Sequence, residues 1–277
     1  MNVDAYLNEI NGLNYKDVSL ENLKNLQINH LKRFPFENLD MHMEKKIIFS
    51  LEDSYDRFIN KSRGGYCLQL NPLFGWLLKE LGYSVQFVPC YIYNVGFKKF
   101  NRLAIHCIII VKLDDKLYYV DAGTSRMLNE PIEITLDLIQ ILKYGTYRFS
   151  KSDDDLYLLD RAKTSDYLKN NSTSLWTHQI KFKMEPKELE FFKEMNDYVQ
   201  TPEHPTMFYR SFASIHTENS IISLNGWNYL EVIFDENNNE QRIEKVLTTD
   251  EVNDILKNKF RLIIEKSFTP KFDDFTM

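Results

Sequence analysis

The sequence predicts a multidomain α+β protein in which helices come first, strands dominate the middle and a mixed region closes the chain. Leucines recur at helical spacing after Ser19, segments rich in Val, Ile, Tyr and Phe fill residues 84–121, and helix and strand signals alternate after Glu185. Such periodicities distinguish amphipathic helices from strands. With 277 residues, of which 43% are apolar, the chain can bury a sizeable core in two to three compact layers.

The first third carries two helix signals. Ser19 is suited to cap a helix whose leucines continue until Phe34-Pro35 stops it. Residues 36–40 then form a connector. A second helix is expected over residues 71–81, because Pro72 stands near its start. The same proline argues against an uninterrupted helix that begins earlier in the chain.

The middle third reads as antiparallel strands. Val, Ile, Tyr and Phe are concentrated in separate segments, and Asp114-Asp115 forms a turn between two of them. The polar, Asp-rich residues 150–155 are expected to be a surface loop. The expected strands are residues 84–94, 102–113, 116–121 and 177–184.

The last third alternates between helix and strand. Glu185-Pro186 opens a helix that is expected to run to about Val199. Thr248 and Glu251, three residues apart, make a capping box for a final helix. The three asparagines at 237–239 suit a hairpin turn. The expected strands are residues 211–215, 220–224 and 229–234.

The charge and the cysteine content of the chain argue against several classes of protein. The chain carries 34 basic and 40 acidic residues, interspersed along it, which argues against recognition of nucleic acid. Its three cysteines, Cys67, Cys90 and Cys107, are too few for a disulfide framework and indicate free thiols in a reducing compartment. The first residues form no signal peptide, and no stretch approaches the ~20 apolar residues that span a bilayer. We therefore expect a cytoplasmic protein without a membrane partner.

The segment of residues 63–71 is the candidate nucleophile site. It places Cys67 behind Gly64 and Gly65 and before an apolar run. Glycines let the backbone turn tightly and approach a ligand closely, and amides at a helix start stabilise a thiolate, the reactive form of cysteine. Arg63 adds positive charge nearby. This context favours a reactive thiol.

A thiol nucleophile needs a base, and that base needs a group that holds its tautomer. His106 lies in the predicted strand 102–113, and Asp121 ends the next predicted strand. Because the strands of a hairpin lie side by side, His106 and Asp121 are expected to face one another at one edge of the sheet. The order of the residues therefore favours a Cys-His-Asp site.

Simpler interpretations of the same residues are open at this point. A lone cysteine in apolar surroundings is usually inert core, and Cys90 and Cys107, which lack the glycine context, are expected to be structural. A histidine in a strand is more often a hydrogen-bonded structural residue, and Asp121 could simply cap a turn. Zinc is not expected, because Cys67, His106 and Cys107 lack the short paired spacing of structural zinc sites.

The chain resembles the arylamine N-acetyltransferases along nearly its whole length. The resemblance rests on ordered motifs, which are residues 34–39, residues 63–71, the strand around His106, and residues 120–123, 195–202 and 270–272. It implies a helical first domain, an antiparallel β-barrel second domain and an α/β lid around a cysteine-protease-like catalytic core. The implied domains are residues 1–83, 84–184 and 185–277.

By this resemblance Cys67 is the acetyl-accepting nucleophile, His106 its base and later proton carrier, and Asp121 the residue that orients the imidazole. The implied reaction is acetyl-CoA-dependent N-acetylation of arylamines, arylhydrazines or N-hydroxyarylamines, a reaction of xenobiotic metabolism. It would follow a ping-pong mechanism through a Cys67 thioester, in a monomer or homodimer and without a metal.

The resemblance also implies supporting residues. Those at the nucleophile turn are Glu37, Arg63, Gly64 and Gly65. Those at the substrates are Phe36 and Thr124 in the acceptor pocket, and Tyr198 and Thr276 at coenzyme A. A pair between Glu37 and Arg63 would tie the connector to the turn, although a solvated surface pair is the alternative. Thr124-Ser125, where many bacterial relatives have a bulky aromatic residue, implies a wider acceptor pocket.

Two other functions are compatible with these residues. The first is a related amide synthase or a thiol hydrolase that uses the same triad with another acyl group or acceptor. The second is a non-catalytic protein that binds aromatic ligands or coenzyme A on this scaffold. An intact set of Cys67, His106 and Asp121 argues against the second, because a buried acid and base have little structural reason to be retained.

Overall fold

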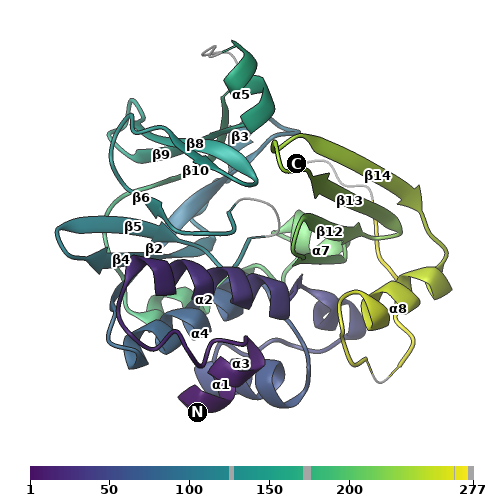
Figure 1. The fold of residues 1–277 in the computed structure, drawn as a ribbon. Helices are drawn as coiled ribbons and strands as arrows, with labels where there is room; N and C mark the ends of the chain where they lie inside the picture. Colours follow the sequence, from purple (N-terminus) through teal and green to yellow (C-terminus); the bar gives the residue numbers. More distant parts are fainter. Residues whose placement is uncertain (125–127, 171–175, 265, 274–277) are drawn as a thin grey trace.

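The computed structural model describes residues 1–124, 128–170, 176–264 and 266–273. Figure 1 shows three groups of elements: helices α1 to α4 at the bottom, a curved sheet at the upper left, and a second sheet with helix α8 at the right. The predicted α+β fold class, with a β-barrel in the middle of the chain, is confirmed.

Four helices form the first part of the protein. They are α1 (Val3–Glu9), α2 (Leu20–Arg33), α3 (Leu51–Tyr55) and α4 (Cys67–Glu80). Helix α2 begins where the sequence predicts, because the Ser19 hydroxyl accepts a hydrogen bond from the Asn22 amide at 3.1 Å. Helix α3 continues into a π-helical turn, Asp56–Asn60.

The start of α4 differs from the prediction. The helix begins at Cys67, not at Asn71, and runs through Pro72. A proline inside a helix removes one backbone hydrogen bond. The first turn is nevertheless closed, because the Tyr66 carbonyl accepts from the Leu70 amide at 2.9 Å. Burial of most of the side chains of α4 offsets the missing bond.

The described residues place nine strands in a curved antiparallel sheet. These are β2 (Ser84–Asn94), β3 (Lys99–Phe100), β4 (His106–Leu113), β5 (Lys116–Val120), β6 (Ile132–Glu133), β7 (Gln140–Leu142), β8 (Gly145–Lys151), β9 (Tyr157–Ala162) and β10 (Thr177–Phe182). Their order is β6-β5-β4-β2-β10-β9-β8-β7, with β3 paired to β2. The Gln140 side chain exchanges two hydrogen bonds, of 2.8 and 2.9 Å, with the Glu133 backbone, so the two edges nearly close a barrel.

The sequence predicts β2, β4, β5 and β10 but not β3 or β6 to β9. Strand β4 begins at His106, four residues later than predicted. The expected loop over 150–155 is narrower than predicted, because β8 extends to Lys151 and the turn follows it.

The last part of the protein is a second antiparallel sheet. Its strands, in spatial order, are β1 (Phe36–Glu37), β11 (Phe212–His216), β12 (Ser220–Asn225), β13 (Asn228–Phe234) and β14 (Glu240–Val246). Strand β14 is not predicted, but the turn before it is: the Asp235 carboxylate accepts from the Asn237 and Asn239 amides at 2.8 Å. The predicted capping box of Thr248 and Glu251 is confirmed at the start of α8 (Thr249–Asn258).

The prediction of a helix over residues 186–199 is wrong for the first half of this range. The Lys187 amide donates a hydrogen bond to the Phe87 carbonyl of β2 at 2.8 Å, which holds the chain extended there. A 3-10 turn (Leu189–Phe192) and helix α6 (Lys193–Tyr198) follow. Two further short helices are α5 (Thr164–Asn170) and α7 (Pro205–Tyr209).

Strand β1 ties the first part of the protein to the last. Phe36 pairs with Ser214 of β11 and forms a second bridge to Gly65, two residues before α4. The predicted connector 36–40 is therefore a short strand followed by a 3-10 helix, Leu39–Met43. This arrangement fixes the start of α4 against the second sheet.

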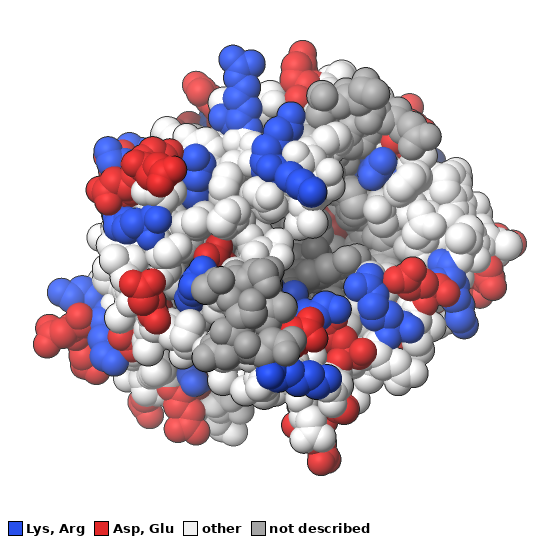
Figure 2. Space-filling view, turned by 90° about the horizontal axis from the view of Figure 1, so that it is seen from above, with Lys and Arg blue, Asp and Glu red and all other residues white. Residues whose placement is uncertain are grey.

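Seen from above, the surface is hollowed near its centre, and basic and acidic side chains lie next to one another around the hollow (Figure 2). Within the described ranges, no helix is both long and apolar enough to cross a membrane.

Candidate active site

Cys67 lies at the first residue of α4, on a turn where the backbone passes very close to its neighbours. A Cβ added to Gly64 would lie 2.0 Å from the Pro35 carbonyl oxygen, and one added to Gly65 would lie 2.6 Å from the Gln69 amide oxygen. A side chain at Gly64 would collide with backbone that cannot move aside, whereas one at Gly65 would require the Gln69 side chain to move. The two glycines therefore allow the turn that leaves the Cys67 side chain half-buried rather than enclosed.

The end of strand β5 packs directly against this turn. A Cβ on Gly123 would lie 2.7 Å from the Cys67 Cα and 2.8 Å from the Asn71 side-chain nitrogen. This contact brings the segment that carries Asp121 against the start of α4. The glycine of the Asp-Ala-Gly sequence is thus required for close approach rather than for an unusual backbone angle.

His106 and Asp121 lie together in the buried space beside Cys67. The His106 Nε2 and the Asp121 Oδ2 are 2.7 Å apart, and both side chains are almost fully buried. The Cys67 sulfur lies close enough to the His106 ring to raise its pKa. Since Nε2 is bonded to the carboxylate, Nδ1 is the ring nitrogen that remains available to the sulfur. The structure therefore brings together the three residues that the sequence proposes.

Besides His106, three other groups donate hydrogen bonds to the Asp121 carboxylate. The Tyr119 hydroxyl donates to Oδ2 at 2.6 Å, while the Asn71 side chain and the Gly123 amide donate to Oδ1 at 2.8 and 2.9 Å. Burial raises the pKa of Asp121, but the charge of His106 and these hydrogen bonds lower it further, so the net pKa lies below its usual value. The carboxylate stays ionised.

The same carboxylate determines the state of His106. Burial lowers the pKa of His106, whereas the negative charges of Asp121 and Cys67 raise it, and the net result is a pKa of about 10. At neutral pH the ring is therefore an imidazolium placed between a carboxylate and a sulfur. This arrangement suits a thiol that reacts as a thiolate.

Comparison with known proteins agrees with this geometry. The model of the N-acetyltransferase family matches residues 19–269. Arylamine N-acetyltransferase 2 of Mesocricetus auratus is 30% identical over 286 residues, which cover 99% of this chain and 98% of the relative. The chain belongs to the arylamine N-acetyltransferase family. Arylamine N-acetyltransferase 1 of Homo sapiens is 28% identical, again over 99% of this chain and 98% of the relative.

Solved structures of this family share the fold. The arylamine N-acetyltransferase of M. tuberculosis superposes with a TM-score of 0.82 and 21% identity over 94% of both chains. The enzyme of Mycobacterium abscessus gives a TM-score of 0.83 and 22% identity over 95% of this chain and 90% of that one. The protein is accordingly an acetyltransferase, an enzyme that uses an acyl-donor co-substrate and a small-molecule amine acceptor.

In this acetyltransferase the pair of Glu37 and Arg63 is part of a larger buried cluster. Arg63 binds Glu37 through Nη2 and Asp40 through Nη1, each at 2.8 Å. Arg57 binds Glu37 at 2.6 Å and also contacts Asp40. Burial raises the pKa of Asp40, but the two guanidinium charges lower it to below its usual value. Two cations and two anions thus neutralise one another behind the turn that carries Cys67.

Three of the four residues implied at the substrates lie in the described part of the chain, and Phe36 and Tyr198 pack against the same hydrophobic cluster as Cys67. Phe36 is half-buried in β1, and Thr124 follows Gly123 with its hydroxyl buried and unpartnered among the described residues. The Tyr198 hydroxyl is bonded to the Glu203 carbonyl at 3.0 Å. Ser125 and Thr276 lie outside the described residues.

The other two cysteines differ from Cys67. Cys90 and Cys107 are fully buried, and burial raises the pKa of both thiols well above the usual value. Within the part of the chain that the structure describes, no group of three or more His, Cys, Asp and Glu side chains is placed to hold a metal ion.

Sequence reasoning assigned no role to four residues that the structure places at the site or behind it. Two of them had a signal. Asn71 is four residues after Cys67 and so shares its face of the helix, and Tyr119 is two residues before Asp121 on the same face of a strand. The other two, Asp40 and Arg57, had none, because only the tertiary fold brings α3 and its π turn against the connector.

Proposed function

We propose that the protein transfers acetyl from acetyl-CoA to the nitrogen of an arylamine, arylhydrazine or N-hydroxyarylamine through a thioester on Cys67. The observation that carries this proposal is the contact between a half-buried thiol and a buried His106 that Asp121 holds protonated. Membership of the family supports the classes of donor and acceptor.

In the first half-reaction the Cys67 thiolate attacks the carbonyl carbon of acetyl-CoA. The carbon–sulfur bond to coenzyme A breaks, and the departing thiolate takes the proton from the His106 imidazolium. The products are an acetyl thioester on Cys67, a neutral imidazole and free coenzyme A. One thioester replaces another, so the site mainly supplies orientation and charge stabilisation.

In the second half-reaction the amine nitrogen attacks the Cys67 thioester. Neutral His106 takes the proton from that nitrogen, the amide forms, and the Cys67 thiolate leaves. The charge states with which the first half-reaction begins are thereby restored. Arylamines suit this step because they are largely unprotonated at neutral pH, whereas aliphatic amines carry a proton on the attacking nitrogen.

The start of α4 supports the proposal as a source of oxyanion stabilisation. Tyr66 makes no side-chain cap to this helix, and the first amides of a helix have no partner within it. The positive end of the helix dipole also lies at Cys67. These groups would bind the oxyanion of each tetrahedral intermediate.

Intact-protein mass spectrometry after incubation with acetyl-CoA alone tests the proposal. We expect wild type to gain one acetyl group, which an arylamine such as 4-aminobenzoate then removes as the N-acetyl product. Cys67→Ala should gain none and should have no turnover, because it lacks the attacking sulfur.

Cys90→Ala is the matched control, since Cys90 is a buried thiol outside the triad. It should become acetylated and turn over like wild type. Acetylation of Cys67→Ala at wild-type stoichiometry, or acyl transfer by wild type without a covalent species, would contradict the mechanism.

A further inference from the structure

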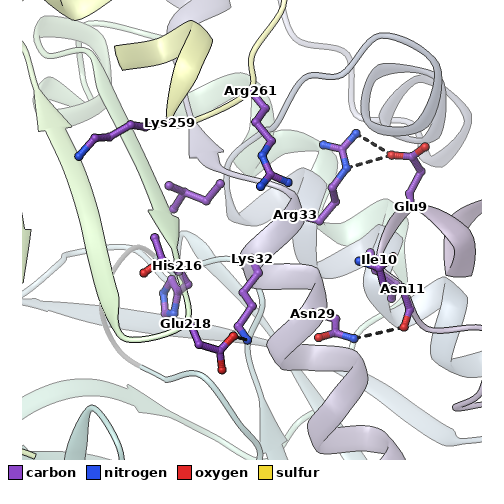
Figure 3. A pocket seen from close by; sticks show the side chains of 12 residues that line it. Glu9, Ile10, Asn11, Asn29, Lys32, Arg33, His216, Glu218, Lys259 and Arg261 are labelled. Carbon is purple, nitrogen blue, oxygen red and sulfur yellow. Dashed lines mark hydrogen bonds and ion pairs between the residues drawn. The ribbon is translucent and has the colours of Figure 1, made fainter. Parts of the chain in front are cut away.

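A cavity of about 420 Å³ lies between the helices of the first part of the protein and the second sheet (Figure 3). Its walls come from α1 and the residues after it, from α2, from β11 and the turn that follows it, and from the segment after α8. None of Cys67, His106 and Asp121 lines it. The cavity is therefore distinct from the acetyl-transfer site.

Positive charge exceeds negative charge in the cavity wall. Four cationic side chains and two carboxylates line it, which are Lys32, Arg33, Lys259, Arg261, Glu9 and Glu218. The formal balance is four minus two, or +2. Each carboxylate already has a partner: Glu9 accepts from Arg33 at 2.6 and 2.9 Å, and Glu218 pairs with Lys32. Lys259 donates to the Tyr229 hydroxyl at 2.9 Å and pairs with Glu231 of β13 at 3.5 Å, so this cation is neutralised from outside the wall.

Arg261 is the cation that no carboxylate balances. It makes no hydrogen bond or ion pair with any described residue. Figure 3 shows its guanidinium turned toward the cavity, on the same side as that of Arg33. Glu9 uses only the Nε and Nη2 of Arg33, so Nη1 of that guanidinium is also left to the cavity. Two guanidinium groups facing one space create a positive potential that favours an anion between them.

His216 provides a second, independent indication. Its side chain is 4% exposed, it lines the cavity, and neither ring nitrogen has a partner among the described residues. Burial, together with the charge of Lys32, lowers the pKa of His216 to about 4, so the ring is neutral at physiological pH and carries one N–H donor. A buried donor without an acceptor is costly unless a ligand or water supplies one.

We propose that this cavity binds a phosphate dianion through Arg261 and Arg33, with Lys32 and the N–H of His216 as further donors. Guanidinium forks match the geometry of phosphate oxygens, and Arg261 supplies a positive charge that no carboxylate neutralises. The cavity is larger than one phosphate and has room for the molecule that carries it. Free phosphate and a phosphate monoester share this chemistry.

Isothermal titration of the full-length protein with inorganic phosphate, at constant ionic strength against chloride, tests the site. We expect one saturable site in wild type, and affinity at least tenfold weaker in Arg261→Gln, which removes the unpaired guanidinium but keeps the aliphatic stem. Phosphate should also raise the melting temperature of wild type more than that of the variant, because it binds only the folded protein.

Arg242→Gln is the matched control, since Arg242 is an exposed arginine of β14 that pairs with Glu244 and does not line the cavity. Its phosphate affinity should equal that of wild type. Absence of saturable binding, equal affinity in Arg261→Gln and wild type, or equal weakening in both variants would overturn the proposal.

A parallel titration with adenosine 5′-monophosphate distinguishes the two sources of the dianion. Tighter binding than inorganic phosphate, with the same dependence on Arg261, identifies a phosphate ester as the ligand. Weaker binding with that dependence identifies free phosphate. The acetylation of Cys67 should be unchanged in Arg261→Gln, so failure of this site and failure of the acetyl-transfer mechanism are separable.

Discussion

Asp121 is the residue on which the candidate site converges. One carboxylate oxygen receives the His106 ring and the Tyr119 hydroxyl, and the other receives the Asn71 side chain and the Gly123 amide. Four donors hold the carboxylate ionised in a fully buried position, where an unpaired charge would be very costly. The ionised carboxylate in turn keeps His106 protonated beside the sulfur.

The variant Tyr119→Phe removes one of these four donors. The hydrogen bond from the Tyr119 hydroxyl lowers the pKa of Asp121. Loss of this bond therefore makes the carboxylate more basic, and the carboxylate then holds the proton on His106 more firmly. His106 then protonates the departing coenzyme A thiolate less readily. A hydrogen bond of about 0.5–1.5 kcal/mol corresponds to a roughly two- to tenfold fall in kcat/KM. We expect that fall, with the alkaline limb of the pH–rate profile moved to higher pH.

Tyr6→Phe serves as the comparison, because Tyr6 is also fully buried and its hydroxyl lies 2.8 Å from the His30 Nδ1, in the helical core. Both variants lose one buried hydroxyl and should lose similar stability. Only Tyr119→Phe should change the pH profile. An unchanged profile in Tyr119→Phe, or the same change in both variants, would show that the hydroxyl acts on stability alone.

At the level of secondary structure, local signals predicted the elements that carry chemistry. The hairpin of β4 and β5 follows from an Ile- and Val-rich run and a shorter run with two tyrosines and a valine, and the site residues lie at one end of it. Strands β6 and β7 are two and three residues long, too short for a periodic signal, and β14 is largely exposed and polar. Their pairing depends on partners distant in the chain.

At the start of α4 a local signal was present but misleading. Local rules placed a helix boundary at Pro72, but packing of the helix against the barrel and the close contact with Gly123 overrode them. Likewise the pair of Glu37 and Arg63 was anticipated, whereas Arg57 was not, because it reaches the cluster from a π turn. Tertiary contacts thus determine where α4 begins and which residues join the ion cluster, and the sequence pattern does not.

Gly123→Ala tests whether the contact between β5 and α4 positions the site. The added methyl would lie 2.7 Å from the Cys67 Cα, so the two segments must separate. Overpacking of this kind costs roughly 1–3 kcal/mol of stability, and a displacement near 1 Å at a reacting group costs on the order of 100-fold in rate. We expect folded protein with about 100-fold lower kcat/KM, measured by arylamine acetylation and circular dichroism.

Gly96→Ala is the corresponding control. A Cβ at Gly96 meets only the Asn94 side-chain oxygen at 3.4 Å, which is an ordinary contact. Its activity and melting temperature should stay near those of wild type. Activity of Gly123→Ala within threefold of wild type would mean that the site tolerates separation of β5 from α4.

Across the whole molecule, two buried histidines connect stability to pH. His30 lies in the helical core against Phe34 and Phe74, and its pKa is lowered to about 3 by burial. His216 lies at the joint between the second sheet and Tyr144 of the barrel, with a pKa lowered to about 4 by burial and by the charge of Lys32. Both rings are neutral in the folded protein at any pH above about 4.

These shifts predict the direction of acid unfolding. An unfolded histidine gains its proton near pH 6.5, whereas the folded rings do not, so the unfolded state binds more protons between about pH 4 and 6.5. Stability then falls as the pH falls through this window, by up to about 1.4 kcal/mol per pH unit for each histidine. The destabilisation by each histidine continues to grow until the pH reaches the pKa of that histidine in the folded protein.

The variant His30→Gln isolates the contribution of His30 to this pH dependence of stability. Glutamine keeps an acceptor for the Tyr6 hydroxyl but does not titrate. Urea unfolding at pH 6.5 and 5.0 should show that the loss of unfolding free energy between the two values is smaller in the variant, by about 1.5–2 kcal/mol. Lower stability of the variant at both pH values would not affect this difference. An equal loss in variant and wild type would mean that His30 takes up its proton at the same pH in the folded and the unfolded protein.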